Sequence, residues 1–202
     1  MELLLTSMLA FLVMLNPVGM FIYLTPVMDD LSHMNFVKVL RKASSISFVI
    51  LMLFFFTGEF LINNVFQIHF ESFRIFGGII IFAYAFYLIV KGQEGLIHMK
   101  ENLDDLASEI ALPFMVGAGT ISLAIIFSYQ FDRVIGVLSI ACVMGVDYLL
   151  ILSFKFFKDG ISKTHFKTAF DKNMHITLRV WGFFMGAIGV NMVVGAILKL
   201  FF

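Results

Sequence analysis

Residues 3–28 read LLLTSMLAFLVMLNPVGMFIYLTPVM, and this stretch decides the fold because it contains no charged residue along its whole length. The hydrocarbon core of a bilayer is about 30 Å thick, and about 20 helical residues at about 1.5 Å each cross it. Near the middle, Asn16-Pro17-Val18-Gly19 interrupts the apolar pattern. Pro17 has no backbone N–H and its ring clashes with the preceding turn, so the stretch predicts a transmembrane helix kinked or broken about halfway across.

The rest of the chain has the same apolar character. Of its 202 residues, 60% are hydrophobic and 14% are charged, and the mean hydropathy is +0.98. Soluble domains are about half apolar and about a quarter charged. The apolar blocks are also too long for transmembrane β-strands of about ten residues. We therefore predict an all-α membrane protein with six transmembrane helices, at about residues 3–28, 43–66, 73–90, 110–129, 134–156 and 178–202.

Little of the chain remains for chemistry in water, and we expect no enzyme activity. The five histidines all fall between the apolar blocks, and none has the spacing of a metal site. No nucleophile–base pair lies within an apolar block. We also expect no cofactor, no metal, no catalytic residue and no nucleic-acid partner. The partner that the composition implies is the lipid bilayer.

The basic residues indicate how the helices are oriented. With six crossings, Arg74, Arg133 and Lys199 fall on the side of both termini, and the other eleven of the fourteen Lys and Arg residues fall on the opposite side. Loops that are rich in Lys and Arg stay in the cytoplasm. We therefore expect a multi-pass protein with both termini outside the cell.

The two halves of the chain resemble each other. The fourth block is interrupted by GAG at residues 117–119, as the first is by NPVG at residues 16–19. The sixth block opens with LRVWG at residues 178–182, and the third opens with FRIFG at residues 73–77. Three crossings per half turn the second copy upside down, as in many secondary transporters. We predict one integral membrane domain, 1–202, with inverted repeats at approximately 1–92 and 106–202 and with helices 1 and 4 broken near mid-membrane.

Two interrupted helices in equivalent positions indicate one shared central site. Backbone groups freed by a break cannot face lipid, so they are buried in protein or line a polar cavity. Proline kinks and glycine pairs also occur in transmembrane helices for packing alone, but the pairing of the breaks favours a cavity. Thr120 and Ser122 follow the second break and could bind a ligand or cap a half-helix. The residues predicted to bind a substrate are Asn16, Pro17, Gly19, Gly117, Gly119, Thr120 and Ser122.

Asp147 lies near the middle of the fifth block. An ionisable side chain inside a membrane span is costly, and such residues usually mark ion or substrate pathways. Asp147 is therefore a candidate for ion coupling or for binding a substrate ammonium group. The alternative is a hydrogen bond to a neighbouring helix.

Four motifs, in this order, resemble those of the MarC family of multi-pass membrane proteins: NPVG at 16–19, FRIFGGI at 73–79, LPFMVGAGTIS at 112–122 and RVWG at 179–182. The resemblance covers essentially the whole chain. It departs at Ala118, where the family typically has proline, and at Trp181, where an aliphatic residue or methionine is more usual. The resemblance implies six transmembrane helices in a bacterial or archaeal plasma (inner) membrane, and transport of small neutral amino acids.

We therefore predict a secondary transporter of small neutral amino acids that works by alternating access. A channel for a small uncharged solute is one alternative, because Asn16-Pro17-Val18 is similar to the Asn-Pro-Ala breaks of aquaporins. An accessory membrane protein without transport activity is another. The sequence leaves open the direction of transport, the coupling ion and the oligomeric state, a homo-oligomer included.

The predicted orientation can be tested by cysteine labelling. In a Cys142→Ser background, single cysteines placed within residues 157–177 should react with a membrane-impermeant thiol reagent only from the cytoplasmic side, because this basic segment follows the fifth crossing. Labelling of the same positions from outside intact cells would contradict the orientation with both termini outside.

Overall fold

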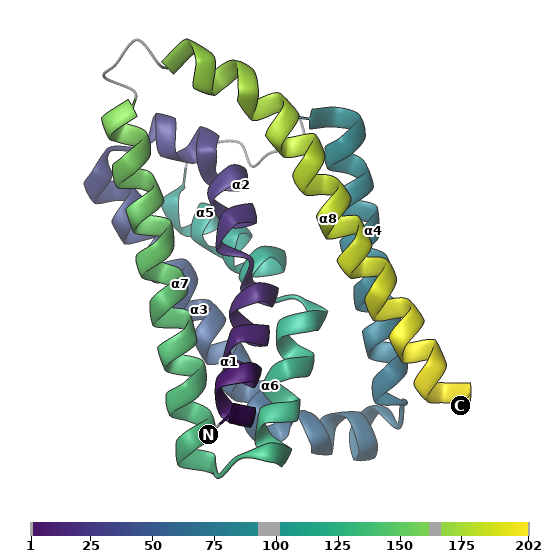
Figure 1. Ribbon diagram of the computed structural model, residues 1–202. Coiled ribbons are helices and arrows are strands. Elements are labelled where there is room, and N and C mark those ends of the chain that lie inside the picture. Colours follow the sequence, from purple (N-terminus) through teal and green to yellow (C-terminus); the bar gives the residue numbers. More distant parts are fainter. Residues whose placement is uncertain (1, 93–101, 162–166, 202) are drawn as a thin grey trace.

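The computed structural model describes residues 2–92, 102–161 and 167–201, and every regular element in these ranges is helical (Figure 1). The protein is therefore an all-helical membrane protein. Its described elements, in chain order, are α1 (Glu2–Leu15), α2 (Pro17–Asp30), α3 (His33–Phe60), the π-helix η1 (Leu61–Phe66), α4 (Phe70–Lys91), α5 (Leu103–Glu109), the π-helix η3 (Ile110–Met115), α6 (Ala118–Gln130), α7 (Arg133–Ile161) and α8 (Lys167–Phe201).

Within the described residues, five segments are long and apolar enough to span a bilayer: Glu2–Asp30, His33–Gly58, Phe70–Lys91, Arg133–Gly160 and Arg179–Phe201. The fourth predicted block, 110–129, is instead divided between η3 and the 13-residue helix α6. The division has a local cause. Leu112 has the extended angles φ −121° and ψ 122°. It precedes Pro113, and a proline ring disfavours helical angles at the residue before it.

Several helices extend beyond their apolar blocks. Helix α3 begins at His33 rather than near residue 43, and the Ser32 hydroxyl accepts a hydrogen bond from the Asn35 N–H at 3.4 Å. Helix α7 continues to Ile161, and α8 begins at Lys167 rather than near residue 178. Hydropathy marks only the lipid-embedded part of a helix, whereas polar residues continue the same backbone hydrogen bonding into water. Residues 162–166, within the predicted loop, lie outside the described residues.

The described helices form two bodies. Helices α4 and α8 pack against each other along their lengths, and the other helices form a bundle beside them (Figure 1). The α4–α8 contact depends on small residues, which let two backbones approach closely. A Cβ added at Gly189 would lie 2.7 Å from the Gly78 carbonyl oxygen and 2.8 Å from the Phe82 nitrogen. The backbones of the pair are therefore in direct contact at this level.

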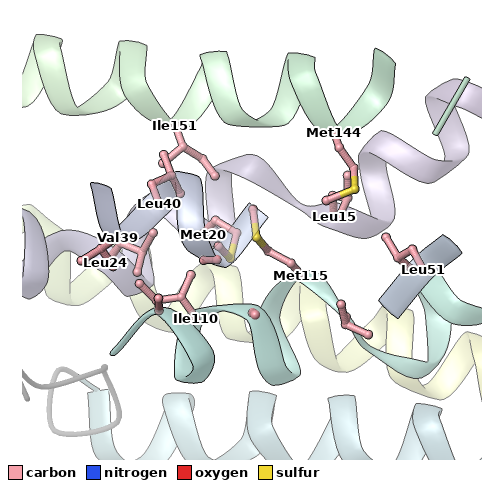
Figure 2. Packing of buried hydrophobic residues seen from close by; sticks show 14 of the residues in the cluster. Leu15, Met20, Leu24, Val39, Leu40, Leu51, Ile110, Met115, Met144 and Ile151 are labelled. Atoms are coloured by element: carbon pink, nitrogen blue, oxygen red, sulfur yellow. The ribbon is translucent and has the colours of Figure 1, made fainter. Parts of the chain in front are cut away.

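The bundle has a continuous apolar core (Figure 2). Its buried side chains come from both interrupted segments and from the two long helices that pack against them. The labelled members are Leu15, Met20 and Leu24 from α1 and α2, Val39, Leu40 and Leu51 from α3, Ile110 and Met115 from η3, and Met144 and Ile151 from α7. Burying them together holds the ends of α1 and η3 at a similar depth inside the protein.

Two lysines of α7 hold the C-terminal end of α2. The Lys155 ammonium donates to the Met28 carbonyl oxygen at 2.5 Å and pairs with Asp159 at 2.9 Å, and Lys158 pairs with Asp29. Both lysine side chains are buried. The last carbonyls of a helix lack intrahelical donors and carry partial negative charge, so cations stabilise them. This contact sets the position of α2 against α7.

The α4–α8 interface predicts different effects for two alanine substitutions on α8. Gly189→Ala places a methyl group against backbone atoms that cannot rotate away, so it should destabilise the protein by about 1–3 kcal/mol and lower its unfolding midpoint by several degrees. Gly186→Ala should be nearly neutral, because its Cβ would lie 3.6 Å from the Ala85 Cβ, an ordinary contact. Thermal unfolding of both variants in detergent is the measurement, and equal midpoints would contradict the close packing.

Candidate functional site

A cavity of about 300 Å³ lies between the bundle and the α4–α8 pair. The bundle contributes the junction of α1 and α2 and the start of α6, and the pair contributes one face of α4 with one residue of α8. The lining residues are Met14, Leu15, Asn16, Met20, Tyr23, Phe73, Phe76, Gly77, Ile80, Ile81, Tyr84, Val116, Gly117, Ala118, Gly119, Thr120, Ile121 and Met185. Its wall is thus mainly apolar, with polar groups at the two chain interruptions and on two tyrosines.

Asn16 separates α1 from α2 in the left-handed conformation, with φ 58° and ψ 60°. Asparagine reaches this region more readily than other residues with a side chain, because its short amide bonds locally. Here its Oδ1 accepts a hydrogen bond from the Gly19 N–H at 3.1 Å, which caps the start of α2. Its Nδ2 donates to the sulfur of Met185 on α8 at 3.1 Å. The side chain therefore links the bundle to α8.

The start of α6 is arranged differently. Gly117 is extended, with φ −116° and ψ 173°, and it supplies no side chain to cap the helix. The Thr120 hydroxyl accepts a hydrogen bond from the Gly117 N–H at 3.0 Å, and the first backbone bond of the helix runs from the Ile121 N–H to the Gly117 carbonyl at 3.0 Å. The N–H groups of residues 118–120 consequently have no acceptor within the helix, and they carry the partial positive charge of its N-terminus.

Two tyrosines complete the polar part of the wall. The Tyr23 hydroxyl donates to the Met185 sulfur at 3.4 Å, and the rings of Tyr23 and Tyr84 meet edge to face at 5.3 Å between centroids. Neither tyrosine belongs to a motif that is recognisable in the sequence. The available signal was their depth: tyrosines in membrane proteins gather near the two interfaces, and these two lie well inside apolar spans.

Four of the seven residues predicted to bind substrate line the cavity: Asn16, Gly117, Gly119 and Thr120. Pro17 is the first residue of α2, where its missing N–H leaves no helical bond unmade. Gly19 is buried against α8, because a Cβ there would lie 2.6 Å from the Trp181 Nε1. Trp181, one of the departures from the family pattern, therefore occupies space that Gly19 leaves free.

Ser122 and Asp147 are buried but lie outside the cavity lining. The Ser122 hydroxyl and both carboxylate oxygens of Asp147 have no hydrogen-bond partner among the described residues. Asp147 is on α7, on the same helical face as Met144 and Ile151, which pack in the core near Leu15 and Leu40 (Figure 2). The structure thus brings the two interruptions together and places the carboxylate in the core behind them.

Comparison with known proteins identifies relatives along the whole chain. The family model described as "MarC family integral membrane protein" matches residues 1–201. The UPF0056 membrane protein PH0214 of Pyrococcus horikoshii is 24% identical over 191 residues, which cover 94% of this chain and 91% of that protein. The UPF0056 membrane protein YvbG of Bacillus subtilis is 29% identical over 195 residues, covering 91% and 88% respectively. No solved structure matches the chain.

The geometry at the start of α6 predicts that a proline is tolerated at position 118. Ala118 is the first residue of the helix and follows an extended Gly117, which is the setting that proline favours. Ala118→Pro should therefore fold with near-wild-type stability. Ala124→Pro, in the buried interior of the same helix, should cost about 3 kcal/mol or more. Detergent-solubilised yield and thermal unfolding measure both, and equal losses would mean that α6 does not begin at Ala118.

Proposed function

The chain belongs to the MarC family of integral membrane proteins, and on this premise we propose that it is a secondary transporter of small neutral amino acids that works by alternating access. The observation that carries the proposal is the cavity in which the end of α1 meets the uncapped start of α6. A volume of about 300 Å³ is at the lower end of the range for small-molecule sites. This size favours a substrate with a small side chain. The proposal assigns the protein no catalytic role.

The two chain interruptions are complementary to a zwitterion. Helix α1 ends at the cavity with its last carbonyl groups, which carry partial negative charge, and α6 begins there with free N–H groups, which carry partial positive charge. A substrate carboxylate binds the N–H groups of residues 118–120, as anions do at helix N-termini. The ammonium group faces the carbonyls at the end of α1, as in transporters with interrupted helices. The apolar wall of α4 accepts a small side chain.

Asn16 and α6 have different roles in this arrangement. The Asn16 amide oxygen is already committed to the Gly19 N–H, so α2 offers fewer free donors than α6. Asn16 instead holds the left-handed turn that brings the end of α1 to the cavity. The carboxylate is therefore assigned to the second interruption rather than to the first.

An inverted repeat, at approximately 1–92 and 106–202, explains why the two interruptions meet. Helix α2 ends at Asp30 and α3 begins at His33, while α6 ends at Gln130 and α7 begins at Arg133. The residues that follow α2 and α6, Leu31 and Phe131, are both extended. Corresponding elements also run in opposite directions along the molecule (Figure 1). Such symmetry places two interrupted helices at one mid-membrane site.

The proposed location is the plasma membrane of a bacterium or archaeon, with both termini outside. The bacterial and archaeal relatives support the choice of organism. The ends of α2, α4 and α7 and the starts of α3 and α8 lie together at the upper end in Figure 1, opposite the two termini. Most of the Lys and Arg residues belong to this upper end, which the distribution of basic residues assigns to the cytoplasm.

Asp147 is proposed as the residue that couples substrate to an ion. A carboxylate that is buried without a hydrogen-bond donor is costly unless a cation or proton neutralises it. Asp147 lies on α7, which packs against α1 and α2. Binding of a cation or proton to Asp147 would therefore affect the helices that form the first interruption. Asp147→Asn should change the affinity for substrate or the ion dependence of transport. If neither changes, Asp147 has no part in coupling.

The transport assay tests the site directly. We expect Asn16→Ala and Gly119→Val to abolish uptake of glycine- or alanine-sized substrates into proteoliposomes while leaving membrane insertion intact. Alanine disfavours the left-handed turn by about 1–2 kcal/mol and removes the cap of α2. Valine at 119 places its Cβ 3.0 Å from the flexible Met14 sulfur and fills the cavity.

The matched control is Gly160→Val near the end of α7, where an added Cβ meets nothing within 4 Å and which does not line the cavity. This variant should transport at the wild-type initial rate. Wild-type rates for both Asn16→Ala and Gly119→Val, with expression checked separately, would place the site elsewhere and end the half-helix proposal. Loss of uptake in the control as well would mean that the assay reports folding rather than the site.

A further inference from the structure

Two surface hollows, separate from the central cavity, join on α3. The first is lined by the basic residues of α3 and the start of α5, and its lining residues are Lys38, Val39, Arg41, Lys42, Ser45, Leu103 and Asp104. The second is an open groove between α3 and α7, lined by Arg41, Ser44, Ser45, Phe48, Val49, Ala141, Met144, Gly145 and Tyr148. Because both hollows include Arg41 and Ser45, they form one surface, basic at one end and mainly apolar along the rest.

The basic end carries excess positive charge. Lys42 pairs with Asp104 at 2.5 Å, and Lys38 and Arg41 have no ion-pair partner among the described residues. Three cations therefore face one carboxylate in a hollow of about 470 Å³. This end of α3 belongs to the side of the protein that the basic residues assign to the cytoplasm. The charge is complementary to an anionic head group rather than to a zwitterionic one.

The groove has the form of an acyl-chain site. It has a volume of about 460 Å³ and is bordered by Val49, which is 67% exposed. A Cβ added at Gly145 would meet no atom within 4 Å, so the floor of the groove is open at this residue. Val49 lies eight residues after Arg41, which corresponds to about 12 Å of helix, running from the basic hollow into the apolar span.

A polar atom lies where the two hollows meet. The Ser44 hydroxyl is buried and has no hydrogen-bond partner among the described residues, although helical serines commonly bond the carbonyl four residues earlier, as Ser45 bonds Arg41 at 2.9 Å. Buried polar groups are nearly always hydrogen-bonded. Ser44 lines the groove beside Ser45, which lines both hollows. The glycerol-linked oxygens of a phospholipid, which lie between its phosphate and its acyl chain, fall at this level.

We propose that this surface binds one anionic phospholipid of the cytoplasmic leaflet. Lys38, Arg41 and Lys42 hold its phosphate, Ser44 donates to a glycerol-linked oxygen, and one acyl chain lies in the groove between α3 and α7. The inference does not depend on the transport activity, because its site shares no residue with the central cavity. The lipid bridges two helices that both contribute to the core around the interruptions.

Native mass spectrometry of the full chain in neutral detergent tests the head-group contact. Dioleoyl phosphatidylglycerol should bind more tightly than dioleoyl phosphatidylcholine. The double variant Lys38→Gln, Arg41→Gln should lose about ten- to thirty-fold of the phosphatidylglycerol affinity, given the usual contribution of a basic residue at an anionic membrane surface. Arg133→Gln, at the opposite end of the molecule, is the matched control and should bind as wild type. Equal binding of the two lipids to the wild type would overturn the proposal.

A second variant tests the groove. Gly145→Leu should fold normally, because the space is open, and should weaken binding of dioleoyl phosphatidylglycerol by about tenfold, by filling the acyl-chain site. Val146→Leu, on the next residue and outside the groove lining, is its control. Unchanged binding in Gly145→Leu would overturn the acyl-chain assignment. Displacement of the lipid by millimolar glycerol phosphate or inorganic phosphate would also overturn it, since the site would then serve a soluble phosphate.

Discussion

The structure depends on one constraint: a backbone N–H or C=O group cannot remain unpaired in lipid. Uninterrupted helices satisfy it within themselves, as α4 and α7 do across their spans. The chain departs from that solution at Asn16 and at residues 116–117, and both departures lie inside the protein. At the first departure, the Asn16 side chain accepts a hydrogen bond from the Gly19 N–H inside α2. At the second, the Thr120 hydroxyl accepts only from the N–H of Gly117, the residue before α6. The N–H groups of residues 118–120 at the start of α6 have no acceptor within the helix, and these three residues line the cavity.

The division into two bodies gives the cavity its position. Close backbone packing at Gly78 and Gly189 holds α4 and α8 together as a pair, and a shared apolar core holds the other helices. Contact between the bodies is made at a few points beside the cavity, including Gly77 against Ala118 and Trp181 against Gly19. A change in the separation of the bodies would therefore change the cavity first.

The charged side chains also reflect the need to satisfy polar groups that are buried away from water. Lys155 and Lys158 of α7 bind the end of α2, and Lys38 and Arg41 line a hollow near the start of α3. None of the described residues that line the cavity is a lysine or arginine. At the cavity, the ends of two helices supply partial charges, which are less costly to bury than full ones. Among the described residues, Asp147 departs from this pattern, because its carboxylate is buried in the core.

The sequence by itself determined the membrane class and five of the six predicted apolar spans, and it predicted that helices end inside two of the apolar blocks. These follow from local properties: hydropathy, the missing N–H of Pro17 and the presence of glycine at 117 and 119. The division of the 110–129 block also has a local cause, the effect of Pro113 on Leu112, but a hydropathy pattern does not reveal it. Only the tertiary structure decided which side chains line the cavity. It brought Tyr23, Tyr84 and Met185 together from three helices, set Trp181 against Gly19, and placed Asp147 in the core outside the lining. Such contacts arise from helix rotation and packing between distant segments, which no local pattern specifies.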